Sequence, residues 1–481
     1  MGDFSRQPRR MRQSASTSTA LTHVSDRPAS TPSSANLAHA LDAAGLALNC
    51  VAQGQALDEA LRGLPSATGT ADRAAPSAAD RAAPSAADRA AAQDIAYTAC
   101  RRLNLLDALA QRLLAKPNPA LDGLVRAALS ELIDHPERAH AIVDQAVTAA
   151  AQVKRGAFKG VINAVLRRFQ REREALLAGL ASDEAIRLQY PAWWIARVRA
   201  AYAAPEADAI LEAGNQRPPM TLRVNRRRVG VDDYAAQLAG AGIAAERTGE
   251  DALLLARPLP VARLPGFAQG LVSVQDLGAQ AAARLLDARD GMRVLDACAA
   301  PGGKTAHILE LAGCGMLALD RDAQRLGAVR DNLARLGLSA TCAAADAARL
   351  EDWWDGEPFD RVLLDAPCTA SGIIRRHPDG KWLKRPADLA QLAAQQRRLL
   401  DALWQVLRPG GKLLYATCSV FPEENAAQVQ AFLSAHAQAG HLEPNLLAPE
   451  NNTPYLLDHR DGQLLPSARH DGFYYALLQK R

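Results

Sequence analysis

Two cysteines follow neighbouring apolar runs that have the composition of β-strands. Cys368 follows the run 359–365, and Cys418 lies at the end of the run 412–419, after a Pro-Gly-Gly turn. Pro367 cannot continue a strand, so the first run must end before Cys368. A cysteine thiolate is a nucleophile that can form covalent intermediates. The alternative is that each cysteine is a small buried hydrophobic residue, as a single cysteine at a strand end usually is.

A disulfide or a metal site would also use cysteines. The chain has 7 cysteines, an odd number, and we find no secretory signal, so the sequence favours reduced thiols and a cytoplasmic protein. It has no C-x-x-C pair and no H-x-x-H cluster, so we expect no metal. No apolar run is long enough to span a membrane.

A loop of small residues supplies the second chemical feature. An apolar run ends in Asp296, the loop follows, and residues 305–311 read as a helix. Doubly wound α/β domains open their nucleotide pocket in this way, and glycines let the backbone approach a ligand. The loop is neither a P-loop nor a G-x-G-x-x-G turn, although residues 303–305 imitate the end of a P-loop.

Two more acids follow later apolar runs. Asp320 ends the run 316–320, where an acid can accept hydrogen bonds from both hydroxyls of a ribose. Asp320 could instead cap the helix that follows, and both roles could hold at once. Asp346 could meet an adenine amino group or be a solvated loop acid. The alternation of strands and helices predicts a doubly wound, Rossmann-like α/β domain over residues 291–481.

These motifs together resemble a known family. Residues 299–304, 365–368 and 417–419 are similar to the signature motifs of the RNA cytosine-C5 methyltransferases, which use S-adenosylmethionine. Residues 372–379 and 422–425 further resemble the bacterial 16S ribosomal RNA cytosine-C5 methyltransferases of the Sun/Fmu type. The resemblance covers essentially residues 35–481. Thr369 departs from the pattern, which has serine after the Pro-Cys pair, but it keeps a hydroxyl.

The resemblance assigns roles to single residues and implies that the cofactor is S-adenosylmethionine and the substrate 16S ribosomal RNA. It implies that Cys418 is the nucleophile, that Cys368 assists breakdown of the covalent adduct, and that Asp365 contacts the cofactor. Asp365 also lies where it could hydrogen-bond the cytosine. The further cofactor-binding residues that it implies are Cys298, Ala299, Ala300, Pro301, Gly302, Gly303, Lys304, Asp320 and Asp346.

The amino-terminal part has a different composition. Residues 1–34 lack periodicity and predict a disordered tail. Residues 35–182 predict an all-α domain, because apolar residues recur at spacings of three and four. An octad repeat, Asp-Arg-Ala-Ala-Pro-Ser-Ala-Ala, occupies residues 71–91 and predicts a flexible low-complexity insertion over about 66–91.

The segment 154–169 resembles the end of a NusB-like RNA-binding helical domain. A basic face of such a domain contacts RNA phosphates. The alternative is that Lys154, Arg155, Arg167 and Arg168 only solvate a helix surface.

Residues 183–290 predict a small α+β connector, and the family places an RNA-binding module there. We expect a helix over 191–203 and strands at 220–224 and 252–255. A basic turn, with Arg226, Arg227 and Arg228, could bind the RNA backbone or be a solvated loop. Tyr190, Trp193 and Trp194 could stack on bases, but core packing is the expected use.

Composition limits function only loosely. The length of 481 residues suggests three domains, and the net charge of +4 permits an RNA partner without requiring one. A methyltransferase acting on protein or on a small molecule would not need Cys418. An RNA-binding or antitermination factor with a vestigial catalytic domain would need neither the loop nor the cysteines. We therefore expect a monomeric RNA cytosine-C5 methyltransferase.

Overall fold

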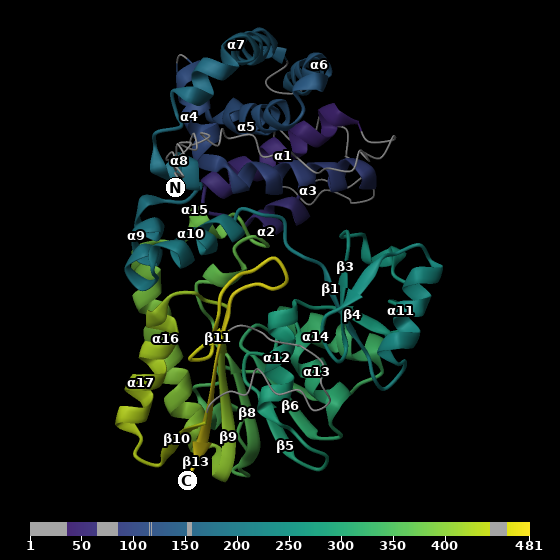
Figure 1. Ribbon diagram of the computed structural model, residues 1–481, viewed down its shortest axis with the longest axis vertical. Coiled ribbons are helices and arrows are strands. Elements are labelled where there is room, and N and C mark those ends of the chain that lie inside the picture. The colour runs from purple at the N-terminus through teal and green to yellow at the C-terminus, as the bar shows by residue number, and fades with distance from the viewer. Residues whose placement is uncertain (1–35, 65–84, 115, 117, 152–155, 443–458) are drawn as a thin grey trace, which may run out of the picture.

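The structure is a computed structural model, and it describes residues 36–64, 85–114, 116, 118–151, 156–442 and 459–481. The tail expected over residues 1–34 lies outside these residues, as do Lys154, Arg155 and most of the expected insertion. A helical domain, a small sheet and a large sheet follow one another along the chain (Figure 1). No helix among the described residues is long and apolar enough to cross a membrane.

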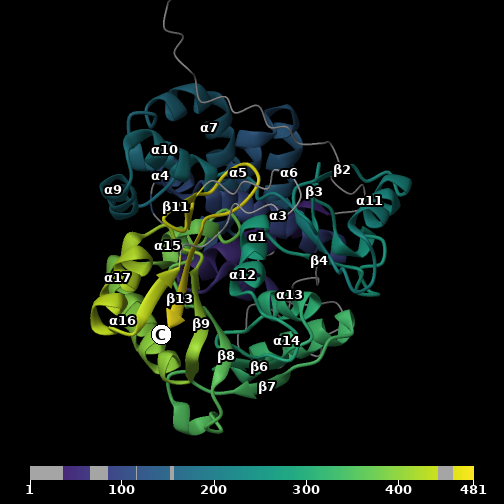
Figure 2. The ribbon, with the colours of Figure 1, turned by 60° about the horizontal axis from the view of Figure 1, so that its bottom comes forward.

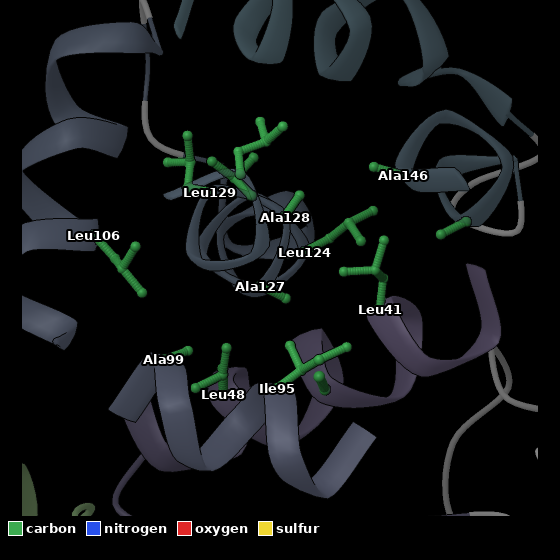
Figure 3. Packing of buried hydrophobic residues seen from close by; sticks show 14 of the residues in the cluster. Leu41, Leu48, Ile95, Ala99, Leu106, Leu124, Ala127, Ala128, Leu129 and Ala146 are labelled. Carbon is green, nitrogen blue, oxygen red and sulfur yellow. The ribbon is translucent and has the colours of Figure 1, made fainter. Parts of the chain in front are cut away.

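The first domain consists of helices packed around α5. Its helices are α1 (Leu37–Ala52), α2 (Leu57–Arg62), α3 (Ala86–Arg101), α4 (Leu103–Leu113), α5 (Pro119–Asp134), α6 (Ala139–Ala150) and α7 (Lys159–Ala178). Side chains from α1, α3, α4 and α6 point toward α5 (Figure 3). The backbones of α1 and α5 touch, because a Cβ on Gly123 would lie 2.0 Å from the Gly45 carbonyl oxygen. The expected all-α domain is confirmed.

Helix α3 begins inside the octad repeat. Ser85 caps the helix, and Ser85 and Asp88 form a reciprocal capping box. Asp88 is buried and also accepts a hydrogen bond from the backbone N–H of Asn36, at the start of α1. The expected insertion over about 66–91 is therefore wrong for residues 85–91. The Ser-x-x-Asp pattern of the repeat is also a helix start, and the contact with Asn36 stabilises that start here.

The connector holds a four-stranded sheet, three helices that precede it and a fourth helix that packs against it. The helices before the sheet are α8 (Glu184–Leu188), α9 (Ala192–Ala201) and α10 (Ala204–Ala213). The sheet has the order β2-β3-β1-β4, with every pair antiparallel, and α11 (Val231–Gly240) packs against it. Its strands are β1 (Thr221–Val224), β2 (Ala245–Arg247), β3 (Ala252–Leu255) and β4 (Val272–Val274). The two expected strands correspond to β1 and β3.

The three aromatic residues near α9 belong to a hydrophobic core. Tyr190 and Trp194 are both 1% exposed, and Trp194 packs edge-on against Phe421 with ring centroids 5.3 Å apart. Trp193 is half-buried beside them. Core packing was the expected use, and burial leaves Tyr190 and Trp194 no face on which a base could stack.

The third region is built on a nine-stranded sheet. Its order is β11-β12-β13-β9-β8-β5-β6-β7, and β10 pairs with β13. Strands β7, β6, β5, β8 and β9 are parallel, whereas β13 is antiparallel to β9. The strands are β5 (Arg293–Asp296), β6 (Gly315–Asp320), β7 (Thr341–Ala344), β8 (Phe359–Asp365), β9 (Leu407–Thr417), β10 (Ala439–Leu442), β11 (His459–Arg460), β12 (Gln463–Leu464) and β13 (Phe473–Lys480).

Helices cover both faces of this sheet (Figure 2). One face carries α12 (Leu277–Leu286), α13 (Gly303–Leu311) and α14 (Ala323–Leu336); the other carries α16 (Pro386–Gln405) and α17 (Ala426–Ala435). The short helix α15 (Gly380–Leu383) precedes α16. The expected doubly wound α/β fold is confirmed.

Two details differ from the sequence interpretation. Helix α12 falls within the expected connector, yet it packs in the core of the large sheet. Strand β9 begins at Leu407, before the Pro-Gly-Gly turn and not after it. Gly410 in this turn adopts a φ of +74°, and the extra residues of β9 between Leu407 and Lys412 bulge out of the ladder. The register consequently passes from Phe359↔Leu407 to Arg361↔Lys412.

Candidate active site

The ends of β8 and β9 bring the two cysteines together. These strands are parallel neighbours up to the pair Asp365↔Ala416, so the residues that follow leave the same edge of the sheet. The Sγ atoms of Cys368 and Cys418 lie 3.4 Å apart and are hydrogen-bonded. Both residues are half-buried free thiols. No group of side chains in the described parts of the chain could hold a metal ion.

Lys304 and Asp365 form an ion pair beside the cysteines. Lys304 Nζ lies 2.6 Å from Asp365 Oδ2, and the lysine side chain is 13% exposed. Burial lowers the pKa of Lys304, but the charge and hydrogen bond of Asp365 outweigh it, so that the pKa lies above its ordinary value. A Cys418 thiolate would raise the pKa of Lys304 further. The site therefore holds a permanent ammonium group within electrostatic range of Cys418.

Several neighbours of the Cys368 thiol favour its protonated form. The hydrogen bond with Cys418 raises the pKa of Cys368 well above its ordinary value, and burial and the charge of Glu424 raise it further. Cys368 is therefore a protonated thiol at neutral pH.

A buried polar cluster supports the loops that carry both cysteines. Glu424 Oε2 accepts a hydrogen bond of 2.6 Å from Thr369 Oγ1, and Glu424 Oε1 accepts one of 2.9 Å from the Thr369 backbone N–H. Ser371 Oγ lies 3.1 Å from Thr369 Oγ1 and 3.0 Å from Ser419 Oγ. We call Thr369, Ser371, Ser419 and Glu424 the polar wall. Burial raises the pKa of Glu424, although hydrogen bonds from the wall lower it.

The sequence interpretation did not assign a role to the polar wall. Residues 422–425 were recognised only as part of a family motif. The available signal was position, because Thr369 and Ser419 each follow one of the cysteines in sequence. The hydroxyl of Thr369, where the family pattern has serine, is one of the groups that donate to Glu424, together with its own backbone N–H and Gln396.

The loop after β5 forms a cradle that fits the expected cofactor. Asp296 is 1% exposed; its Oδ2 accepts a hydrogen bond from Thr305 Oγ1 at 2.6 Å, while its Oδ1 has no partner. Gly302 adopts a φ of +94°, and a Cβ there would lie 3.1 Å from Val329 Cγ1. The contact at Gly302 shows that the loop packs closely on α14 and that glycine is required there. The unpaired buried oxygen of Asp296 is the feature that fits a polar ligand.

Asp320 lies at the end of β6, as expected. Its carboxylate accepts hydrogen bonds from the backbone N–H groups of Ala300 at 3.2 Å and Asp322 at 3.0 Å. Helix α14 is capped by Asp322, which accepts from the N–H groups of Gln324 and Arg325. The alternative that Asp320 caps this helix is therefore wrong. Each Asp320 oxygen retains a lone pair for a ligand hydroxyl.

The remaining loop residues lie across the tops of β5 and β6. The Ala299 N–H donates to the Leu319 carbonyl at 2.7 Å, and the Ala300 carbonyl accepts from Arg325 at 2.9 Å. Pro301 follows Ala300. Cys298 is half-buried, and burial raises the pKa of its thiol, as do nearby carboxylates.

Asp346 lies at the rim of this cradle. Its Oδ1 accepts a hydrogen bond from the Ala348 N–H at 3.0 Å, and its Oδ2 lies 2.8 Å from Arg398 Nη2. Burial raises the pKa of Asp346, but these hydrogen bonds outweigh it and lower the pKa below its ordinary value. Asp346 therefore remains ionised, with its charge partly neutralised by Arg398.

The basic turn after β1 contacts protein groups. Arg227 donates to the carbonyl of Glu310 near the end of α13, and Arg228 donates to the carbonyl of Leu336 at the end of α14. Arg226 is paired with Asp251 at 3.2 Å. All three side chains are exposed. Arg227 and Arg228 join the small sheet to α13 and α14, which neither interpretation of the turn included, whereas Arg226 stays within the connector.

Arg167 and Arg168, the two described residues of the expected basic face, also have protein partners. Arg168 lies 3.0 Å from Glu172 and donates to the Arg112 carbonyl, and Arg167 donates to Gln170. An RNA contact by Arg167 and Arg168 stays a prediction. Such a contact would require both side chains to leave their protein partners.

Family comparisons cover all three regions of the chain. The model described as "16S rRNA methyltransferase RsmB/F" matches residues 283–479, the "Methyltr_RsmF/B-like, ferredoxin-like domain" matches 190–262, and the "NusB family" matches 47–171. The order of the three matches is the order of the three folded regions.

Individual relatives and solved structures agree with this order. The Ribosomal RNA small subunit methyltransferase B of Pseudomonas syringae pv. tomato is 46% identical over 397 residues, which are 81% of this chain and 88% of the relative. The crystal structure of PH0851 superposes with a TM-score of 0.72 at 24% identity, covering 92% of this chain and 99% of that one. A methyltransferase homolog from Pyrococcus horikoshii gives a TM-score of 0.53 at 29% identity, covering 62% and 97%. The chain therefore belongs to the RsmB/F family of 16S rRNA methyltransferases.

Proposed function

We propose that this chain transfers a methyl group from S-adenosylmethionine to carbon 5 of one cytosine in 16S ribosomal RNA, through a covalent bond between Cys418 and the base. The observation that carries the proposal is the 3.4 Å contact between the Sγ atoms of Cys368 and Cys418, beside the Lys304–Asp365 ion pair. The free thiols suit a cytoplasmic enzyme, and we propose that it acts there as a monomer.

The cofactor-binding residues would be those of the cradle. Asp320 would accept hydrogen bonds from ribose hydroxyls, and Asp346 would lie at the rim. Residues 298–303 would line the ligand with small side chains, and Lys304 would follow them beside Asp365. When bound, S-adenosylmethionine would supply a methyl group on a positively charged sulfur, which is an electrophile that needs no metal.

Cys418 would activate the base. Carbon 5 of cytosine is a poor nucleophile, and addition of the Cys418 thiolate to carbon 6 converts the ring into an enamine-like species that reacts at carbon 5. The Lys304 ammonium stabilises negative charge in this part of the site. Asp365, held by Lys304, would accept a hydrogen bond from the base.

Cys368 would assist release. The carbon 5 proton must leave, its electron pair must form the carbon 5–carbon 6 double bond, and the bond from carbon 6 to Cys418 Sγ must break. The hydrogen bond with Cys418 is the largest cause of the raised pKa of Cys368. That cause would disappear once Cys418 Sγ is bonded to carbon, whereas burial and the charge of Glu424 would still raise the pKa of Cys368. The position of Cys368 Sγ, 3.4 Å from Cys418 Sγ, places it beside the bond that must break.

The two cysteine variants test this division of labour. Cys418→Ala should abolish methylation, whereas Cys368→Ala should leave a covalent protein–RNA adduct that appears as a shifted band on a denaturing gel. An adduct with Cys418→Ala and none with Cys368→Ala would show that the roles are exchanged. Full activity in both variants would remove the covalent mechanism.

Bisulfite sequencing of 16S ribosomal RNA tests the product. Cells that lack the protein should lose one protected cytosine, and wild-type protein should restore it, whereas Cys418→Ala should not. An unchanged protection pattern would contradict methylation at carbon 5 of cytosine.

A further inference from the structure

Arg223 lies in the middle of the connector sheet, but its side chain reaches into the methyltransferase domain. Its backbone lies in β1, opposite Ala252 of β3 and Ser273 of β4. The side chain is 0% exposed and crosses from the small sheet to α13. Both figures show the small sheet beside α13 and α14 (Figures 1 and 2).

Arg223 forms a two-pronged ion pair with Glu310 of α13. Arg223 Nε lies 2.9 Å from Glu310 Oε2, and Arg223 Nη2 lies 2.8 Å from Glu310 Oε1. The Glu310 side chain is 2% exposed, so both charges are removed from water. Two buried charges in this geometry compensate each other, and removal of one would leave the other unpaired.

The third nitrogen of Arg223 contacts the cofactor cradle. Arg223 Nη1 donates to the Gly303 carbonyl oxygen at 2.8 Å and also to Gln275 Oε1. Gly303 is the first residue of α13, between Gly302, whose φ is +94°, and Lys304. The guanidinium therefore fixes the backbone at the point where the loop becomes a helix and where the site lysine begins.

Other arginines join the same two domains at a different place. Arg227 and Arg228 donate to carbonyls near the carboxyl ends of α13 and α14. Arg335 of α14 donates to the Phe267 carbonyl at 2.8 Å and to the Val272 carbonyl at 3.0 Å. In the described residues, the contacts of these three arginines lie away from residues 298–304, so Arg223 differs from them in what it holds.

We propose that Arg223 is a positioning residue that holds the cofactor loop at Gly303 from the ferredoxin-like connector. The connector would then contribute to cofactor binding as well as to joining the domains. The proposal rests on the proposed function in one respect, namely that S-adenosylmethionine binds this loop.

The test separates loop positioning from buried charge. Arg223→Met alone would leave Glu310 unpaired, so the variant is made together with Glu310→Met, which replaces both charges by side chains of similar volume. Arg223→Lys is the second variant, because one ammonium group cannot donate to Glu310 and Gly303 in the same geometry. Arg335→Met is the control, since it removes a domain contact that does not touch the loop.

Two measurements are made on each full-length variant. Hydrogen exchange without cofactor reports the protection of the Gly302 and Ala306 amides, which donate to the Ala299 and Gly302 carbonyls at the start of α13. Calorimetry reports S-adenosylmethionine affinity. We expect the double variant and Arg223→Lys to exchange faster at these amides and to bind the cofactor about 10-fold more weakly. Arg335→Met should do neither.

Three results would overturn or redirect the proposal. Equal losses in Arg335→Met would show that domain docking in general, and not Arg223, holds the loop. Unchanged exchange and affinity in both Arg223 variants would overturn the proposal. If the double variant failed to fold, unchanged exchange and affinity in Arg223→Lys alone would overturn it. If the wild-type protein did not bind S-adenosylmethionine, the proposed function would fail, while hydrogen exchange would still decide whether Arg223 holds the loop.

Discussion

The core of the helical domain and the polar wall behind the cysteines are both buried, but different forces hold them. Alanine and leucine side chains fill the helical core, and the backbones of α1 and α5 touch at Gly45 and Gly123 (Figure 3). The polar wall is held by hydrogen bonds with fixed directions among hydroxyls and Glu424.

The difference indicates what each region controls. Packing of apolar groups is not directional, so the helical core sets how stable the fold is and where the helices cross. A hydrogen-bonded network fixes atoms in place, so the polar wall sets where Cys368 and Cys418 lie relative to each other. Substitutions in the first region should reduce stability, and those in the second should reduce activity more than stability.

Gly123→Val should have the largest effect on stability. A Cβ at Gly123 would lie 2.0 Å from the Gly45 carbonyl oxygen, so α1 and α5 must separate. We expect a loss of about 5 kcal/mol in the free energy of unfolding, at the upper end for one substitution. Denaturant unfolding followed by circular dichroism measures it. Gly160→Ala in α7 is the control, because a Cβ there meets nothing within 4 Å. A similar loss of stability in both variants would show that the contact between Gly123 and Gly45 is not the cause.

Asp296 should make stability depend on pH. Burial raises its pKa from 3.8 to about 7, and the charge of Asp365 adds to this. The folded protein therefore holds a proton that the unfolded chain releases between these values, so stability falls as pH rises through this range. Titration of Asp296 should change the free energy of unfolding by up to about 4 kcal/mol across this range, and Asp296→Asn should remove that change. Thermal unfolding of both proteins from pH 4.5 to 7.5 tests this; parallel curves would contradict it.

Glu424→Gln should separate activity from stability. The amide would present a donor to one of the groups that now donate to Glu424, so one hydrogen bond of the wall is lost. We expect the free energy of unfolding to fall by about 2 kcal/mol and kcat to fall about 100-fold. Glu423→Gln, at an exposed neighbour, should change neither. A loss of stability without loss of activity would mean that the wall does not position the cysteines.

Arg228→Ala should have the smallest effect. The side chain loses its hydrogen bonds to the Leu336 and Gln269 carbonyls, which are worth about 1 kcal/mol together. Because this side chain already has protein partners, the salt dependence of RNA binding should stay the same. Filter binding at several salt concentrations measures the slope of log affinity against log salt concentration. A decrease of about 0.7–0.9 in the magnitude of this slope would indicate that Arg228 contacts a phosphate.

The sequence predicted the parts of the site that depend on strand ends. Asp296, Asp320 and Asp365 end apolar runs, and period and composition locate such ends without further information. Neighbouring parallel strands then bring Cys368 and Cys418 to one edge. These relations are local or follow from one topology, so they could be derived from sequence.

The parts that were missed depend on contacts distant in sequence. Arg223 meets Glu310 across 87 positions, and Thr369 meets Glu424 across 55. The basic turn was assigned to RNA or solvent because composition does not show which carbonyls lie nearby. The role of α12 was missed for the same reason, since its apolar face fits either neighbouring domain.

The start of α3 has a consequence for how the gene can vary. The eight residues before Ser85 and the eight before those both end in Ala-Asp-Arg-Ala-Ala-Pro. Loss or gain of one whole octad therefore restores Pro-Ser-Ala-Ala-Asp at the start of the helix. The capping box and the contact of Asp88 with Asn36 would survive such a slip in copy number. The chain can therefore differ in length at this point while its first domain keeps the same atoms in the same places.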